Sequence, residues 1–239
     1  MIFYIAIIPS IVLLAYIYKK DTKEKEPMKL LMKLFILGVL LIIPAIIFET
    51  IFEAPAEAFA TPGSFGYAFY EAFIVAALVE EVCKYIAMRE ITWKSREFNC
   101  MYDGIVYAVF VSLGFATFEN LMYVMDGDLS TAVARMLTSI PGHTCFAVYM
   151  GFYFSRAKLC RVRGEKKEAK RFKRKALFIP IVLHGIYDYC IMVDESVVGE
   201  WSSTIAIIVW VVYICILFKK TFGFVKQASD SDFYFDTLE

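Results

Sequence analysis

The sequence predicts an all-α fold: a polytopic membrane helix bundle of about seven transmembrane helices, with its N-terminus outside and its C-terminus in the cytoplasm. Hydrophobic residues make up 59% of the 239 residues and the mean hydropathy is +0.60, which is too apolar for a soluble domain of this size. The net charge of zero gives no reason to expect a nucleic-acid partner. Apolar stretches alternate with charged segments, and Lys and Arg gather in every second charged segment.

Each apolar stretch is long enough to cross a bilayer as a helix. A transmembrane helix needs about 17–25 apolar residues, whereas barrel strands are ~10-residue alternating segments, and no such alternation occurs. The seven stretches are residues 2–18, 30–52, 67–88, 102–125, 131–155, 176–193 and 202–218. The expected organisation is one transmembrane domain over residues 1–225 and an acidic cytoplasmic tail over 226–239, which the composition predicts to be disordered.

The distribution of basic residues predicts the orientation. Segments 19–33, 89–99, 156–175 and the tail from residue 219 hold all but two of the 25 Lys and Arg residues. The intervening loops, 53–66, 126–130 and 194–201, hold none. Because cytoplasmic loops carry the Lys and Arg excess, the basic segments are placed inside and the N-terminus outside.

Polar residues inside the predicted spans mark a candidate site. An ionisable group in a membrane costs at least ~2.5–3.5 kcal/mol, so several of them in consecutive spans indicate a function. The candidates are Glu80, Glu81, Lys84, Glu119, Asn120, His143, His184 and Asp188. Glu49, Glu71 and Arg135 lie near span ends, where snorkelling to the membrane interface is expected.

Helical spacing predicts two matched pairs. Glu80 and Lys84 are four residues apart and share a helix face, whereas Glu81 points about 100° away from Glu80. His184 and Asp188 are also four apart, so the carboxylate can orient the imidazole.

Depth along the helices predicts which groups can meet. At ~1.5 Å per residue, Glu80 and His184 both lie about 13 Å from the cytoplasmic edge. His143 lies near ~20 Å, and the preceding Pro141 can break the helix and re-aim it. Glu119, at about 24 Å in a straight helix, is the hardest to bring to the same point.

Such a set of groups could hydrolyse a peptide bond inside the membrane. A glutamate can act as a general base toward water, and a histidine can share that role. A second imidazole beside a carboxylate can stabilise the oxyanion of a tetrahedral intermediate. The sequence has no Gly-x-Ser-x-Gly elbow, no His-Glu-x-x-His motif and no phosphate-binding glycine loop, which argues against serine hydrolases, zincins and nucleotide-dependent enzymes.

Three alternatives remain open from the residues alone. Zinc could be held by a set drawn from Glu80, Glu81, His143 and His184, with water in the remaining position. Metal-free chemistry is favoured over zinc because the spacing matches no zinc motif. A proton-coupled transporter also lines its pathway with such groups, and a scaffold protein could use the pocket only to bind a transmembrane helix.

Four motifs occur in order between residues 80 and 190. They are Glu80-Glu81-x-x-Lys84, the segment 103–120 that ends in Phe118-Glu119-Asn120, Pro141-Gly142-His143, and His184-Gly185-Ile186-Tyr187-Asp188. In this order they resemble the PrsW family of intramembrane proteases, which is distantly similar to the CAAX-prenyl and bacteriocin-processing proteases. A single Glu-Glu pair would be weak, but four ordered motifs are a specific signal.

The resemblance implies a multi-pass protease of the bacterial plasma membrane. It would make the first, site-1 cut in a single-span anti-sigma factor under envelope stress, so that an extracytoplasmic-function sigma factor is released after further proteolysis. Membrane lipid and the anti-sigma factor are the implied partners.

The resemblance also implies residue roles. By similarity to the CAAX-type enzymes, Glu80 or Glu81 with His143 would activate water, and His184 with Asp188 would form the oxyanion side. Lys84 would have a supporting role and hold the carboxylate pair. CAAX-type enzymes instead place an arginine one residue later in the sequence. Asp188 stands where an asparagine is common, so its charge must be neutralised or serve to orient His184. The implied cut is extracytoplasmic, so either the spans are shifted or a wet cavity opens outward past Glu119 and Asn120.

Overall fold

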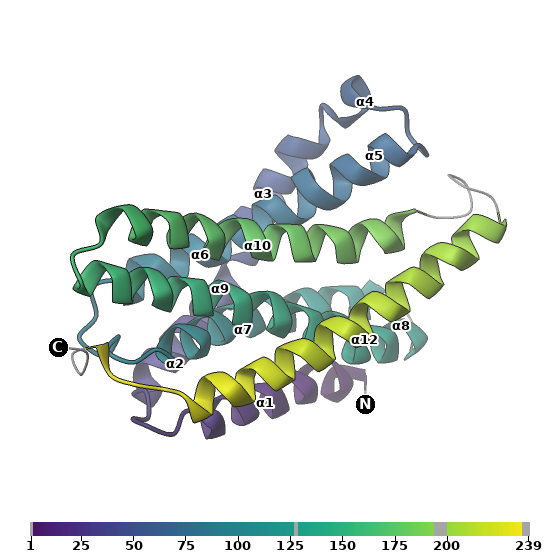
Figure 1. Cartoon of the computed structure of the whole chain (residues 1–239). Coiled ribbons are helices and arrows are strands. Elements are labelled where there is room, and N and C mark those ends of the chain that lie inside the picture. The colour runs from purple at the N-terminus through teal and green to yellow at the C-terminus, as the bar shows by residue number, and fades with distance from the viewer. Residues whose placement is uncertain (1, 127–128, 194–199, 236–239) are drawn as a thin grey trace.

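The computed structural model describes residues 2–126, 129–193 and 200–235, and all helices and turns in these ranges belong to one helical bundle (Figure 1). The elements are α1 (Ile2–Lys20), α2 (Met28–Leu40), α3 (Ile42–Glu53), α4 (Ala56–Phe59), α5 (Phe65–Tyr70), the π-helix η1 (Glu71–Leu78), α6 (Val79–Thr92), α7 (Asp103–Asp126), α8 (Leu129–Leu137), α9 (Ser139–Val162), α10 (Lys166–Met192) and α12 (Glu200–Asp230). Within the described ranges, β pairing is limited to an isolated bridge between Cys100 and Tyr234. The predicted all-α class is therefore confirmed.

The helices coincide with the apolar stretches of the sequence. Within the described residues, four segments are long and apolar enough to cross a membrane: Met28–Phe59, Asp103–Met125, Lys166–Met192 and Thr204–Asp230. The stretch 131–155 is divided at Thr138 into α8 and α9. The count of seven spans and the orientation of the termini stay predictions. Most of the predicted loop 194–201 lies outside the described residues.

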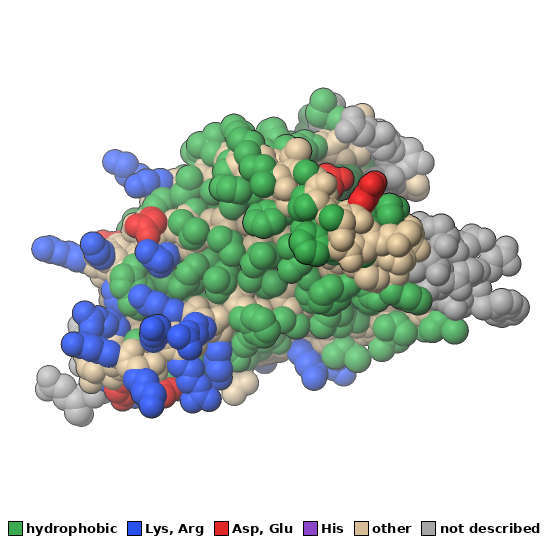
Figure 2. All heavy atoms as spheres, turned by 90° about the horizontal axis from the view of Figure 1, so that it is seen from above, with side chains coloured by type: hydrophobic (Ala, Val, Ile, Leu, Met, Phe, Trp, Pro, Cys, Tyr) green, Lys and Arg blue, Asp and Glu red, His purple; other side chains and the backbone are tan. Residues whose placement is uncertain are grey.

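Basic side chains gather at one end of the bundle, near the turn between α9 and α10 (Figure 2). Much of the segment 156–175 is helical, because α9 continues to Val162 and α10 begins at Lys166. The connecting turn uses Gly164, whose φ of 79° is a conformation that favours glycine. Hydrophobic side chains cover most of the remaining face in Figure 2, as expected for a surface that contacts lipid.

Helix α7 lies at the centre of the bundle and packs against α1, α2 and α9. Close contact depends on glycines, since a Cβ added at Gly114 would lie 2.1 Å from the carbonyl oxygen of Phe35. A Cβ added at Gly38 would likewise lie 2.1 Å from the carbonyl oxygen of Val111. Small residues let membrane helices approach closely, and here they fix α7 against α2.

Helices α3, α4 and α5 lean away from the rest of the bundle (Figure 1). The change of direction follows α2, which ends at Leu40. Pro44 lies near the start of α3 and cannot donate a backbone hydrogen bond to the carbonyl four residues earlier, so the helix is interrupted there. Helix α3 nevertheless packs against η1 and α6.

The C-terminal tail differs from the predicted disorder over its described part. Helix α12 continues to Asp230, and the backbone N–H of Phe235 donates to the carbonyl of Asn99 at 2.8 Å. The ring of Phe235 packs against Phe98 and is 4% exposed. Aromatic residues within the acidic tail supply apolar surface to bury, which composition alone did not reveal. Residues 236–239 lie outside the described part of the chain.

Candidate active site

Glu80, Glu81 and Lys84 form a buried ionic cluster in the first turns of α6. The Nζ atom of Lys84 lies 2.8 Å from Oε2 of Glu80 and 2.9 Å from Oε1 of Glu81. All three residues are at most 6% exposed. The predicted Glu80–Lys84 pair is present. The expectation that Glu81 points elsewhere is wrong, because a long lysine side chain also reaches the residue three positions earlier.

A π-helical segment leads into these carboxylates. Residues 71–78 form η1, which ends two residues before Glu80, and π-helical turns are frequent at functional sites. The segment packs closely on α10 at Gly185, where an added Cβ would lie 2.3 Å from the ring of Phe73. Because Gly185 follows His184, this contact places the glutamates of α6 beside that histidine.

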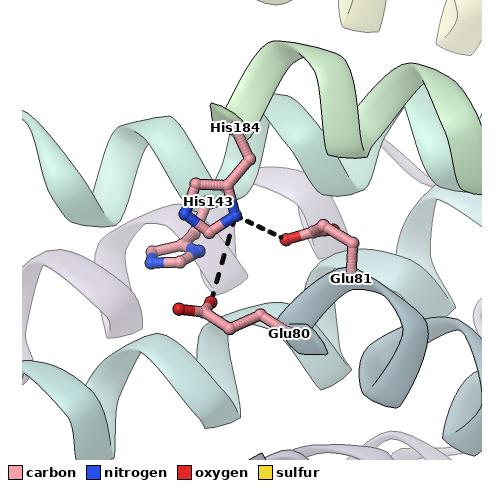
Figure 3. Close-up of side chains that lie close together, drawn as sticks. All are labelled: Glu80, Glu81, His143 and His184. Atoms are coloured by element: carbon pink, nitrogen blue, oxygen red, sulfur yellow. Dashed lines mark hydrogen bonds and ion pairs between the residues drawn. The ribbon is translucent and has the colours of Figure 1, made fainter. Parts of the chain in front are cut away.

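His184 contacts carboxylates through both ring nitrogens. Its Nδ1 lies 3.1 Å from Oε1 of Glu81 and 4.0 Å from Oε2 of Glu80 (Figure 3). Its Nε2 lies 3.1 Å from Oδ2 of Asp188, so the predicted pairing on α10 is present. An imidazole can donate to both carboxylates at once only when it is protonated.

His143 joins the same cluster from α9. Its Nδ1 lies 3.2 Å from Nζ of Lys84, and its Nε2 lies 3.0 Å from Oε2 of Glu119. Because an ammonium group can only donate, Nδ1 accepts and Nε2 carries the hydrogen that Glu119 accepts. The acceptor nitrogen of His143 therefore faces the glutamates of α6.

Glu119 belongs to the site, contrary to the expectation that it is the hardest residue to bring there. Along straight helices, Glu119 and His143 differ in depth by only a few residues of helix rise, a difference that the two side chains bridge. Pro141 lies in the first turn of α9, where its missing N–H has no intrahelical partner to lose. The break in the helix falls before it, at Thr138, so His143 lies near the start of α9.

Arg135 is a site residue that the sequence reasoning missed. Its Nη2 lies 2.8 Å from Oε1 of Glu119, and its Nε donates to Oδ1 of Asn120 at 3.1 Å. Its guanidinium stacks 3.7 Å above the ring of Tyr123. The expected snorkelling of Arg135 is therefore wrong. The sequence did contain a signal, because Arg135 lies inside an apolar stretch and apart from every basic segment. A charge in that position requires a partner.

These side chains enclose a cavity of about 80 Å³. A buried water needs roughly 10–15 Å³ of such space and several polar partners, so the cavity has room for a few waters. Its lining residues are Ala76, Glu80, Glu119, Tyr123, Arg135, Ser139, His143, Phe146, His184, Tyr187, Asp188 and Met192. The structure thus brings the predicted groups of four helical segments around one polar space.

The Arg135–Glu119 contact predicts a positioning role for Arg135. Arg135→Gln removes the ion pair that holds Glu119 against His143, and we expect the rate of substrate cleavage to fall about 10–100-fold, as for residues that orient a functional histidine. Arg135→Lys should restore part of the loss. Arg171→Gln, at an exposed arginine of α10, is the matched control. Equal cleavage rates for Arg135→Gln and the control would exclude this role.

The cluster has donors suited to a metal ion. Ligand atoms from four buried residues lie within 4.8 Å of one another: Glu80, Glu81, His143 and His184. Carboxylate and imidazole groups are the ligands of catalytic zinc, and both histidines have their Nε2 held by a carboxylate, an arrangement that orients metal ligands. Oε2 of Glu81 is buried with no hydrogen-bond partner in the described part of the chain. The donor set fits zinc if the ammonium group of Lys84 moves out of the space between Glu80, Glu81 and His143.

Comparison with known proteins identifies the family of this chain. The family described as "PrsW family intramembrane metalloprotease" matches residues 26–217. The chain is 38% identical over 187 residues to a Protease PrsW of Geobacillus kaustophilus, which covers 78% of both chains. It is 34% identical over 222 residues to that of Clostridioides difficile, covering 91% of this chain and 87% of the relative. It is 33% identical over 183 residues to that of Bacillus subtilis, covering 77% and 79%.

No solved structure matches this chain. The family match includes all four motifs and every residue of the polar cluster. The four apolar segments of sufficient length within the described part of the chain agree with a membrane protein. The chain therefore belongs to the PrsW family of intramembrane proteases.

Proposed function

We propose that this protein is a site-1 protease of the bacterial plasma membrane that cleaves a single-span anti-sigma factor and thereby activates an extracytoplasmic-function sigma factor. The observation that carries the proposal is that Glu80, Glu81, His143 and His184, from α6, α9 and α10, form one buried cluster, and that Glu80 and both histidines line the cavity beside it. Burying ionisable groups in a membrane is costly, and their convergence favours catalysis over structural pairing. A transporter has less support, because the family consists of proteases.

The contacts support a division of roles around the cavity. Glu80 or Glu81 takes a proton from water as the water oxygen bonds to the scissile carbonyl carbon, and His143 shares this role when Lys84 releases its Nδ1. His184, held by Asp188, donates toward the carbonyl oxygen that becomes negative. When the C–N bond breaks, the proton held by the glutamate or histidine moves to the leaving amine.

In this proposal the site is metal-free, and Lys84 is the cation that balances the glutamates. Its ammonium group lies within 2.8–3.2 Å of Glu80, Glu81 and His143, the position from which a single positive charge serves all three. The alternative is a zinc enzyme with the same residues as ligands. A bound zinc ion would supply Lewis-acid polarisation of the scissile carbonyl.

Metal removal distinguishes the two mechanisms. We expect purified protein to keep its cleavage rate after exhaustive treatment with a chelator, and to contain far less than one transition-metal ion per chain by mass spectrometry. Stoichiometric zinc, with activity lost on chelation and restored by zinc, would overturn the metal-free mechanism. Lys84→Gln adds an internal check: it should abolish cleavage if Lys84 is the required cation, whereas a zinc site should retain metal in this variant.

Co-expression with an anti-sigma factor encoded beside a sigma factor in the same genome tests the substrate. We expect a cut within or just outside the apolar segment of the anti-sigma factor, located by mass spectrometry of the fragment. An intact anti-sigma factor in the presence of folded protease would refute this substrate.

The proposed topology has seven spans, with the basic end of the bundle in the cytoplasm. The Lys and Arg side chains at this end support the orientation. The cavity then connects outward past Glu119, which would allow an extracytoplasmic cut.

A further inference from the structure

A groove of about 300 Å³ is lined mainly by residues of α3, η1 and α7. Its lining residues are Ile42, Ile46, Glu49, Glu53, Glu71, Val75, Ala76, Glu80, Phe115, Glu119, Met122, Tyr123 and Met192. Five of them, among them Glu80 and Glu119, also line the cavity that holds His143 and His184. A polypeptide lying in the groove would therefore reach the candidate catalytic groups.

The groove carries an excess of negative charge. Five of its lining residues are glutamates, and neither Lys nor Arg is among them. Glu80 and Glu119 have cationic partners within the site. Glu49, Glu53 and Glu71 form no ion pair with Lys or Arg among the described residues, and one buried carboxylate oxygen of Glu71 has no hydrogen-bond partner there.

The rest of the groove is apolar. Its apolar lining residues include Ile42, Ile46, Val75, Phe115 and Met122. Apolar side chains can bury surface against these residues. The occupant that matches both features is a peptide segment that is apolar along most of its length and carries Lys or Arg at one end, as at the boundary of a transmembrane segment.

We infer that this groove binds the substrate polypeptide and selects a Lys or Arg next to the apolar segment, through Glu53 and Glu71. Glu53 is the last residue of α3 and Glu71 is the first residue of η1, and both line the groove. An anionic lipid headgroup is disfavoured, because the carboxylates would repel it. The inference rests on the proposed protease function. It adds that the preferred substrate carries a positive charge next to its apolar segment.

Three single-span reporter peptides test the inference. They differ only in two adjacent residues outside the apolar segment, which are Lys-Lys, Gln-Gln or Glu-Glu. With wild-type protein in neutral liposomes, we expect the Lys-Lys reporter to be cleaved about tenfold faster than the Gln-Gln reporter, and the Glu-Glu reporter to be the slowest. The difference should shrink in high salt, since these charges are partly exposed.

Substitutions in the groove should change this order. The double variant Glu53→Gln/Glu71→Gln should remove most of the difference between the reporters, and Glu53→Lys/Glu71→Lys should reverse it. Glu57→Gln is the matched control, because Glu57 is an exposed glutamate of α4 that does not line the groove. The control should keep the wild-type order.

Capture of the reporters separates this inference from the proposed function. A photoreactive group in place of Ile46, in protein that carries Glu81→Gln, should crosslink the Lys-Lys reporter most strongly even though no cleavage occurs. If the Lys-Lys reporter is captured most strongly but the wild-type protein cleaves none of the reporters, the protease function is refuted and the groove assignment stands. Equal capture or equal cleavage of all three reporters would overturn the groove assignment.

Discussion

Glu81→Gln should abolish proteolysis while leaving the protein folded. Glu81 is fully buried, and its carboxylate contacts both Lys84 and His184. The amide that replaces it has nearly the same shape but cannot accept a proton from water. Loss of a general base costs about 10²–10⁴-fold in rate, so cleavage of a co-expressed anti-sigma substrate should fall below detection. Initial rates with purified protein in liposomes would measure the loss.

A matched control lies on the same helix. Glu90 is an exposed glutamate of α6 paired with Arg89, and Glu90→Gln should leave the cleavage rate unchanged. Glu80→Gln and His143→Ala should behave like Glu81→Gln if these groups act together. Cleavage by all three variants at rates close to that of the wild type, with normal accumulation, would remove these residues from the mechanism.

Gly114→Leu should prevent stable folding of the bundle. An added Cβ at Gly114 already lies 2.1 Å from the backbone oxygen of Phe35, which cannot rotate away as a flexible side chain could. Gly114→Ala should therefore force α7 and α2 apart and destabilise the protein by about 1–3 kcal/mol, the range for overpacking. Leucine adds three more carbons at the same point. The accumulation of each variant in membranes and its melting temperature in detergent would show the effect.

Gly223 provides the comparison for this prediction. It lies within α12, and an added Cβ there meets no atom within 4 Å. Gly223→Ala should be neutral or slightly stabilising, since alanine favours a helix by about 1 kcal/mol over glycine. If Gly114→Ala and Gly223→Ala melted at the same temperature, the close packing of α7 on α2 would not be a source of stability.

The fold class and most of the site were predictable because both depend on local patterns. Apolar stretches of sufficient length predicted the helices, and the structure places a helical segment at each. The spacing of His184 and Asp188, and of Glu80 and Lys84, correctly predicted contacts within one helix. Contacts at three or four residues depend only on helix geometry, which is the same in every protein.

Other features depended on how the helices meet. Depth counted along straight helices made Glu119 the hardest group to bring to the site, although it binds His143. Arg135 was expected at the membrane interface, because nothing in the sequence shows that α8 turns it toward Glu119. The π-helical segment before Glu80 was not predicted either, since its apolar sequence is compatible with an ordinary α-helix.

The sequence by itself determined that this protein is a helical membrane protein with the PrsW motifs, because hydropathy, charge placement and motif spacing are properties of the linear chain. Tertiary structure alone decided that His143 contacts Lys84 and His184 contacts Glu81, and that an acidic groove leads to this cluster. The physical reason is that these arrangements depend on the tilt, breaks and close approach of separate helices. Backbone packing at glycines and the helix interruption near Pro44 set the tilt and spacing of the helices. They therefore affect the positions of residues that are distant in the sequence.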